Sequence, residues 1–179
     1  MAITTSPDNI PSPTSGDPYN YVVDMAALAD RIQKIFTANM TWAGANRPAF
    51  MAGRSSDVTK SGTSSISAFV FDTIQLNNGG HYNTANGRFT APVSGLYTFT
   101  VSTTQITTAS GPELHAYKNG ALYVSNLAVG YYTAYRTFGG TVVVWLDAGD
   151  YFDIRWVNNL NSTVTLDGSR SNFSGHYLG

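Results

Sequence analysis

The stretch Asp72–Val101, DTIQLNNGGHYNTANGRFTAPVSGLYTFTV, decides the fold of this chain. It holds two short strand patterns, a turn rich in Asn and Gly, a second turn at Pro92–Gly95 and a long alternating segment. Within Leu96–Ser102, aromatic or aliphatic residues alternate with Thr and Ser, which is the period-two pattern of a half-buried strand. The stretch therefore predicts antiparallel all-β structure.

Similar strand patterns recur at near-regular spacing on both sides of this stretch. The dipeptide Asn119-Gly120 separates two of them and predicts a tight hairpin. Thr141–Leu146, TVVVWL, is apolar on both faces and predicts a central strand. Repeated short strands with turn punctuation indicate a sandwich or a barrel. The predicted strands are Arg47–Arg54, Ile66–Phe71, Leu96–Ser102, Glu113–Lys118, Ala121–Val124, Thr141–Leu146, Tyr151–Val157 and Ser171–Leu178.

Composition limits the classes of function. The 179 residues suffice for one all-β domain with a real core, and only 12% of them are charged. A formal net charge of −1 gives no long-range field, which argues against nucleic acid as a partner. The chain has no cysteine, and no apolar run approaches the ~20 residues of a membrane-spanning helix, so we expect no membrane insertion. The first residues also lack the pattern of a signal peptide.

The first 18 residues are rich in Pro, Ser and Thr and almost free of bulky apolar side chains. This composition fits either a disordered tail or an extended peptide that lies over a partner surface as an anchor. Residues 19–39 follow with the single helix pattern of the chain, and residues 40–46 read as a linker to a head at 47–179.

The helix pattern carries a narrow apolar seam with 4-3-4-3 spacing. A helix of this length is marginal alone in water, because nucleation is costly, so it needs a partner. It either packs against its own β domain or self-associates as a short coiled-coil neck, where Ile at several seam positions favours more than two strands. The seam residues are Tyr21, Met25, Leu28, Ile32 and Ile35.

Recognisable catalytic chemistry is missing from the sequence, so we expect no enzyme, no catalytic residues and no cofactor. His81, His115 and His176 lie in different segments without ligand spacing and read as structural histidines. Asp147, Asp150 and Asp153 span a predicted strand, turn and strand. A role in the turn is favoured for Asp147 and Asp150 over metal binding, and we predict no metal site.

One segment concentrates aromatic side chains around an arginine. Such a surface can stack on sugar C–H faces, can form a protein interface or can pack into the core. We hold it as a candidate recognition or trimer-interface site, and the polar segments Thr103–Gly111 and Asn158–Arg170 as predicted outward loops. The residues of this aromatic segment are Tyr131, Tyr132, Tyr135, Arg136 and Phe138.

From about Arg47 to Leu178, several segments in order resemble the globular head of complement component C1q and its tumour-necrosis-factor-like relatives. This resemblance implies a ten-stranded jelly-roll sandwich that assembles as a homotrimer and serves recognition rather than catalysis. The sequence departs from vertebrate members because it has no collagen-like stalk, and the helical seam stands in its place. The matching segments are RPAF (Arg47–Phe50), FDTIQLNNGGHYNTANGRFTAPVSGLYTFT (Phe71–Thr100), HAYKNG (His115–Gly120), WLDAGDYFDI (Trp145–Ile154) and NFSGHYL (Asn172–Leu178).

The Pro-rich leader followed by DPYNYVVDMAALADRIQKIF resembles the start of small structural proteins of actinobacterial phages. We therefore predict a bacteriophage virion protein, made in the bacterial cytoplasm without a signal peptide. It would be a trimeric fibre, spike or decoration protein that contacts other virion proteins through its N-terminal segment. Its head would bind a host-surface glycan or protein. The alternatives are a purely architectural capsid or tail protein and a secreted bacterial adhesin.

Overall fold

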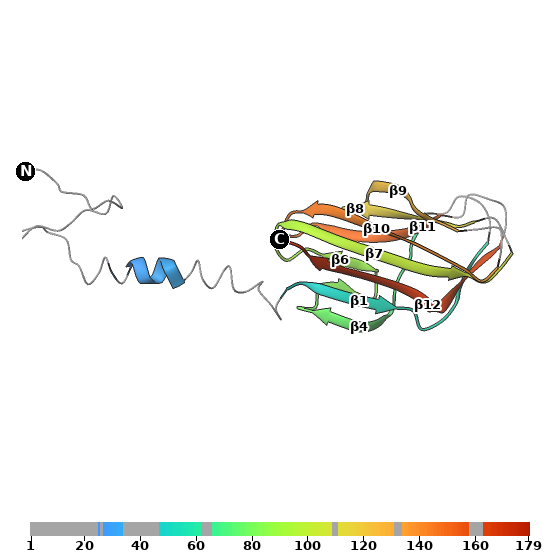
Figure 1. Cartoon of the computed structure of the whole chain (residues 1–179), viewed down its shortest axis with the longest axis horizontal. Coiled ribbons are helices and arrows are strands. Elements are labelled where there is room, and N and C mark those ends of the chain that lie inside the picture. The colour runs from blue at the N-terminus through green and yellow to red at the C-terminus, as the bar shows by residue number, and fades with distance from the viewer. Residues whose placement is uncertain are drawn as a thin grey trace, which may run out of the picture. The chain divides into compact units, whose positions relative to one another are not determined.

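The computed structural model describes residues 25, 27–33, 47–61, 66–108, 111–130, 134–157 and 163–179 of the chain. These belong to two compact units, Met1–Ala43 and Gly44–Gly179 (Figure 1). The predicted tail at 1–18 and linker at 40–46 lie outside the described residues.

The first unit contains the predicted helix, described at residues 25 and 27–33. Met25, Leu28 and Ile32 are all exposed on it, each by about half or more of its surface. Tyr21 and Ile35 lie outside the described residues. The described helical residues form no segment that is long and apolar enough to cross a membrane.

The second unit is a two-layered antiparallel β sandwich, which confirms the all-β jelly-roll prediction (Figure 1). One sheet has the strand order β10-β7-β12-β1-β4, with β2 paired to β12. We call it the first sheet. Its strands are β1 (Ala49–Gly53), β2 (Val58–Lys60), β4 (Thr73–Asn78), β7 (Gly95–Gln105), β10 (Arg136–Leu146) and β12 (Val164–Tyr177).

The second sheet has the order β5-β6-β11-β8-β9, with β3 paired to β11. The hairpin predicted at Asn119-Gly120 is confirmed, since both residues have positive φ, +50° and +80°, and join β8 to β9. The strands of this sheet are β3 (Ser67–Ala68), β5 (Tyr82–Asn83), β6 (Arg88–Thr90), β8 (Glu113–Lys118), β9 (Ala121–Val129) and β11 (Tyr151–Val157).

Aromatic rings fill the space between the sheets. The alternation in β7 and β11 turns Phe99 and Phe152 toward each other, and their rings stack with centroids 4.3 Å apart. Phe173 of β12 contacts Phe50 edge-on at 4.9 Å, and Phe50 stacks on Tyr82 of the other sheet at 4.6 Å. Large buried rings contribute most of the apolar area that drives folding, so this layer holds the two sheets together.

The strand predicted as central is instead an edge strand, and this prediction was wrong. Within the described residues, β10 ends the strand order of the first sheet and pairs with β7. Val144 and Leu146 face the core, whereas Val143 and Trp145 are 50% and 54% exposed. One face of the segment is apolar because it packs in the core, and the other face presents exposed apolar side chains at the surface. An apolar pattern on both faces therefore does not place the strand in the middle of the sheet.

Two further predictions fail for physical reasons. Of the predicted strand Ile66–Phe71, only Ser67–Ala68 pairs with β11, although Phe69 and Phe71 are fully buried. The predicted outward loops contain strand at both sites, because β7 extends to Gln105 and β12 begins at Val164. The two segments bond to each other across the sheet, since the Thr165 backbone N–H donates to Thr107 Oγ1 at 3.0 Å.

Candidate functional site

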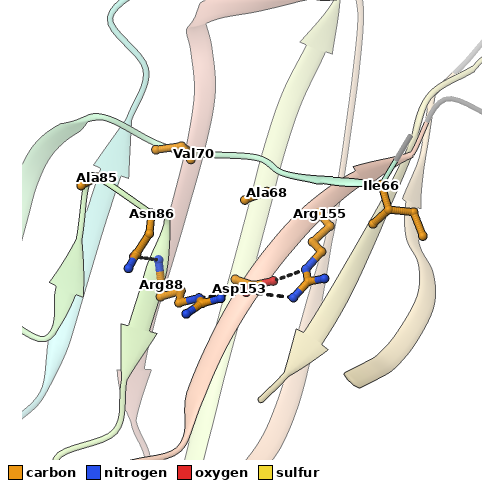
Figure 2. A pocket seen from close by; sticks show the side chains of 8 residues that line it. All are labelled: Ile66, Ala68, Val70, Ala85, Asn86, Arg88, Asp153 and Arg155. Carbon is orange, nitrogen blue, oxygen red and sulfur yellow. Dashed lines mark hydrogen bonds and ion pairs between the residues drawn. The ribbon is translucent and has the colours of Figure 1, made fainter. Parts of the chain in front are cut away.

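A pocket lies on the outer side of the second sheet, above β11. Phe152, Ile154 and Trp156 point into the core, so the alternation turns Asp153 and Arg155 outward. Register places Arg88 of β6 directly opposite Asp153. Figure 2 shows Arg88 and Arg155 reaching the Asp153 carboxylate from two sides.

The walls of the pocket come from two segments. The run from Ile66 to Val70 contains β3 and lies beside β11, and the turn with Ala85 and Asn86, which precedes β6, closes the other side (Figure 2). The cavity has a volume of about 340 Å³, near the lower end of the range for small-molecule sites. Its lining combines small apolar side chains with two guanidinium groups, one amide and one carboxylate.

Asp153 anchors both arginines. Its side chain is only 2% exposed, and its Oδ1 accepts a hydrogen bond from Arg155 Nε at 2.9 Å. Arg88 Nε forms an ion pair with Oδ2 at 3.6 Å. The hydrogen bond to Asp153 raises the pKa of Arg155, against the opposing effect of burial. A buried carboxylate is costly unless it is paired, and two cations around one anion leave a net positive site.

Two tyrosines hold the guanidinium groups from the neighbouring positions of the sheet. The Arg155 guanidinium carbon lies 4.0 Å from the ring centroid of Tyr117, and that of Arg88 lies 4.1 Å from the ring centroid of Tyr151. Both distances are within the range of cation–π attraction. The arginines are therefore fixed by stacking as well as by charge before any ligand arrives.

The outer side of the first sheet carries a different surface, which we call the apolar face. Its side chains come from neighbouring strands and the C-terminal segment, and register aligns Trp145 with Leu96 and Met51 with Leu76. Each is exposed by 42% or more of its surface. Exposed apolar side chains of this kind mark an interaction surface. The register puts Ser174 and Thr100 between Met51 and β10, so the apolar side chains form two groups on this face. The residues of the apolar face are Met51, Leu76, Leu96, Val143, Trp145 and Leu178.

The predicted aromatic segment is not one cluster among the described residues. Tyr131 and Tyr132 lie outside the described residues. Tyr135 is 72% exposed with a positive φ of +59°, and Arg136 is exposed at the start of β10. Phe138 is buried in the core, because strand alternation places it on the same side as Val144, so its assignment as a surface residue was wrong.

Asp147, Asp150 and Asp153 separate as expected from their spacing. Asp150 Oδ2 accepts a hydrogen bond from the Asp147 backbone N–H at 2.9 Å within the turn, which confirms the turn role. Asp153 lies in the pocket instead. His115 Nε2 lies 3.0 Å from Glu113 Oε2 on β8, and burial lowers the pKa of His81. In the described parts of the chain, no three His, Asp or Glu residues are grouped to hold a metal ion.

Sequence reasoning missed the pocket. One signal was present, because Asp153 and Arg155 are two positions apart on a strand and so share a face. The other partner, Arg88, comes from a distant segment and becomes visible only through strand register.

Comparison with known proteins agrees with the jelly-roll architecture. The C1q domain profile matches residues 49–178. One of the mouse complement C1q subcomponent proteins is 32% identical over 108 residues, which cover 60% of this chain and 42% of that protein. The chain therefore spans less than half the length of that relative.

Two solved structures share the fold. The globular domain of a zebrafish complement 1qA protein has a TM-score of 0.54 at 17% identity, over 74% of this chain and 98% of that one. The Eiger TNF structure from S. frugiperda has a TM-score of 0.57 at 12% identity, over 74% and 93%. Identities this low bear on the fold alone.

Proposed function

Because the chain belongs to the C1q domain family, we propose that it is a non-enzymatic binding protein that assembles as a homotrimer in a bacteriophage virion. The head would recognise a host-surface glycan or protein, and the N-terminal segment would attach the head to other virion proteins. The trimer is the part of the proposal on which the rest depends, because one weakly binding head gains useful affinity only through multivalency.

The apolar face is the single observation that carries the trimer proposal. Val143 and Trp145 lie on a long edge strand, and an edge with exposed apolar side chains promotes association unless it is covered. A second copy packed on this face would remove its exposed apolar area from water. Each Å² of apolar area buried in this way stabilises the assembly by about 25 cal/mol. A second copy of the chain is always present at the same concentration, so self-association can cover this face without any other protein.

The helix supports the same assembly from a separate part of the chain. Met25, Leu28 and Ile32 share one stripe and are exposed. A three-stranded neck would bury this stripe. The assignment to a phage particle depends on the first 40 residues, whose pattern resembles that of phage structural proteins.

The test uses the native particle and the purified full-length chain. Deleting residues 1–16 should remove the protein from purified particles, as measured by mass spectrometry, while the deleted chain stays folded and trimeric in solution. Unchanged particle content would contradict the anchoring role. Labelled full-length protein should also adhere to host cells. A protein that is present in particles yet does not adhere would have the architectural role alone.

A further inference from the structure

We propose that the pocket above β11 binds the carboxylate of an acidic sugar unit, such as a hexuronate in a surface polysaccharide. This inference rests on the proposed function and names the ligand class for it. Arg88 and Arg155 would bind the carboxylate, and the small apolar wall would contact the C–H face of the sugar ring. Asp153 is a positioning residue that holds both arginines.

The charge balance of the pocket selects a singly charged anion. Two guanidinium groups face one carboxylate, which leaves about one positive charge. Nearby, Glu113 Oε2 lies 3.0 Å from His115 Nε2, and Arg54 lies near Asp72. A sugar carboxylate carries one negative charge, whereas a phosphate monoester carries about 1.5 to 2 at neutral pH. One carboxylate therefore neutralises the positive charge of the two arginines and Asp153, whereas a phosphate monoester would leave the pocket with net negative charge.

Hydrogen-bonding capacity remains for a ligand. A guanidinium group carries five N–H donors in a fixed fork that matches a carboxylate. Asp153 engages Nε and Nη2 of Arg155 and only Nε of Arg88. Arg88 is also the more accessible of the two, with a side chain 41% exposed. It is the arginine best placed to meet an incoming anion.

The shape and lining favour a sugar over a peptide. A cavity of about 340 Å³ suits one small ring rather than an extended chain. Ala68, Val70 and Ala85 offer a low apolar wall, and Asn86 adds an amide whose Oδ1 already accepts from the Arg88 backbone N–H at 3.1 Å. The amide nitrogen of Asn86 is thus a donor for a ring hydroxyl. Stacking of both arginines on tyrosines lowers the ordering cost of binding.

The test is a titration of the full-length chain with a short hexuronate oligosaccharide, followed by calorimetry or NMR. The matched ligand is the same oligosaccharide as its methyl ester, which keeps the ring and removes the charge. Arg88→Gln should weaken uronate binding by about 10- to 100-fold, the range for loss of a charged hydrogen bond. Added salt should weaken it further. Asp153 keeps its hydrogen bond to Arg155 in this variant, so the variant should unfold cooperatively and stay folded at the titration temperature, which a thermal unfolding scan checks.

The control variant is Arg170→Gln. Arg170 also forms an ion pair with an aspartate, Asp167 at 3.6 Å, but lies on β12 in the first sheet. Its substitution should leave binding unchanged. Equal affinity for the methyl ester, tighter binding of inorganic phosphate or of an acidic peptide, no binding of uronate, or unchanged binding by Arg88→Gln would each overturn the inference. If the parent protein and the Arg88→Gln variant adhere equally to host cells, the proposed function stands and the pocket inference fails. Absence of the chain from particles contradicts the proposed function instead.

Discussion

The Tyr82 hydroxyl bonds to the backbone of Phe71, which lies after β3 and pairs with no strand. Removing this hydroxyl tests how much these two hydrogen bonds contribute to stability. Tyr82 Oη accepts a hydrogen bond from the Phe71 N–H at 3.2 Å and donates one to the Phe71 carbonyl at 3.1 Å. Phe71 is fully buried, so both backbone groups lie away from water. One phenol thus does for Phe71 what a neighbouring strand does for a residue in a sheet, whereas the Phe69 N–H still donates to the Ile154 carbonyl of β11 at 2.8 Å.

The size of the effect follows from these two bonds. Tyr82→Phe keeps the ring and its stacking on Phe50 but leaves a buried donor and a buried acceptor unsatisfied. Each unsatisfied group costs about 1–3 kcal/mol, so for two groups we expect a loss of about 2–6 kcal/mol in the free energy of unfolding. For a domain of this size, such a loss lowers Tm by roughly 10 °C.

The measurement is urea unfolding at fixed protomer concentration, because association shifts apparent stability. Tyr97→Phe is the matched control: its hydroxyl donates one bond, to the Val93 carbonyl at 2.7 Å, in a partly buried site. We expect about 1 kcal/mol for it, the typical net value of one hydrogen bond. If Tyr82→Phe costs no more than Tyr97→Phe, the reasoning about the Phe69–Phe71 segment is refuted.

Two further predictions concern the assembly and the acid response. Under the proposed assembly, Trp145→Ser should convert the trimer to smaller species in light scattering at micromolar concentration. Ile66→Ser, about equally exposed but next to β3 of the second sheet, should not. A trimer that survives Trp145→Ser contradicts the role of the apolar face. Hydrogen bonds from Asn119, the Asp147 backbone and Lys118 lower the pKa of Asp150 to about 2. The stabilisation from this carboxylate is present above its unfolded pKa, near 4, and is lost as pH falls toward 2. The stability difference between the parent protein and Asp150→Asn should therefore shrink in urea unfolding between pH 4 and pH 2, and a constant difference would contradict the assignment.

The sequence predicted the β sandwich because its signals are local. The alternation in β7 and the Asn119-Gly120 turn each depend on residues a few positions apart, and the structure confirms both. The position of β10 in its sheet was not predictable in the same way. An apolar outer face looks identical in sequence whether another layer of the same chain or a second copy of the chain covers it.

The site shows the same division. The Asp153 and Arg155 pair was readable from strand alternation, but Arg88 and the wall at Ile66–Val70 come from segments that meet only in the folded chain. Phe138 was predicted at the surface because it lies in an aromatic-rich segment, but it is buried in the core. Strand register decides which side chains face the core and which residues meet across strands, and a single sequence does not reveal the register.

The interior position of β1, between β12 and β4, has a mechanical consequence. β1 is bonded on one side to β12 and on the other to β4, with Ala49 opposite both His176 and Asn78. Antiparallel ladder bonds lie perpendicular to the strands. A pull on the chain before Ala49, against a head held at its opposite end, is directed along β1 and loads both ladders in shear. All of these bonds must then yield together, so the load enters the head through a strand that is hydrogen-bonded on both edges.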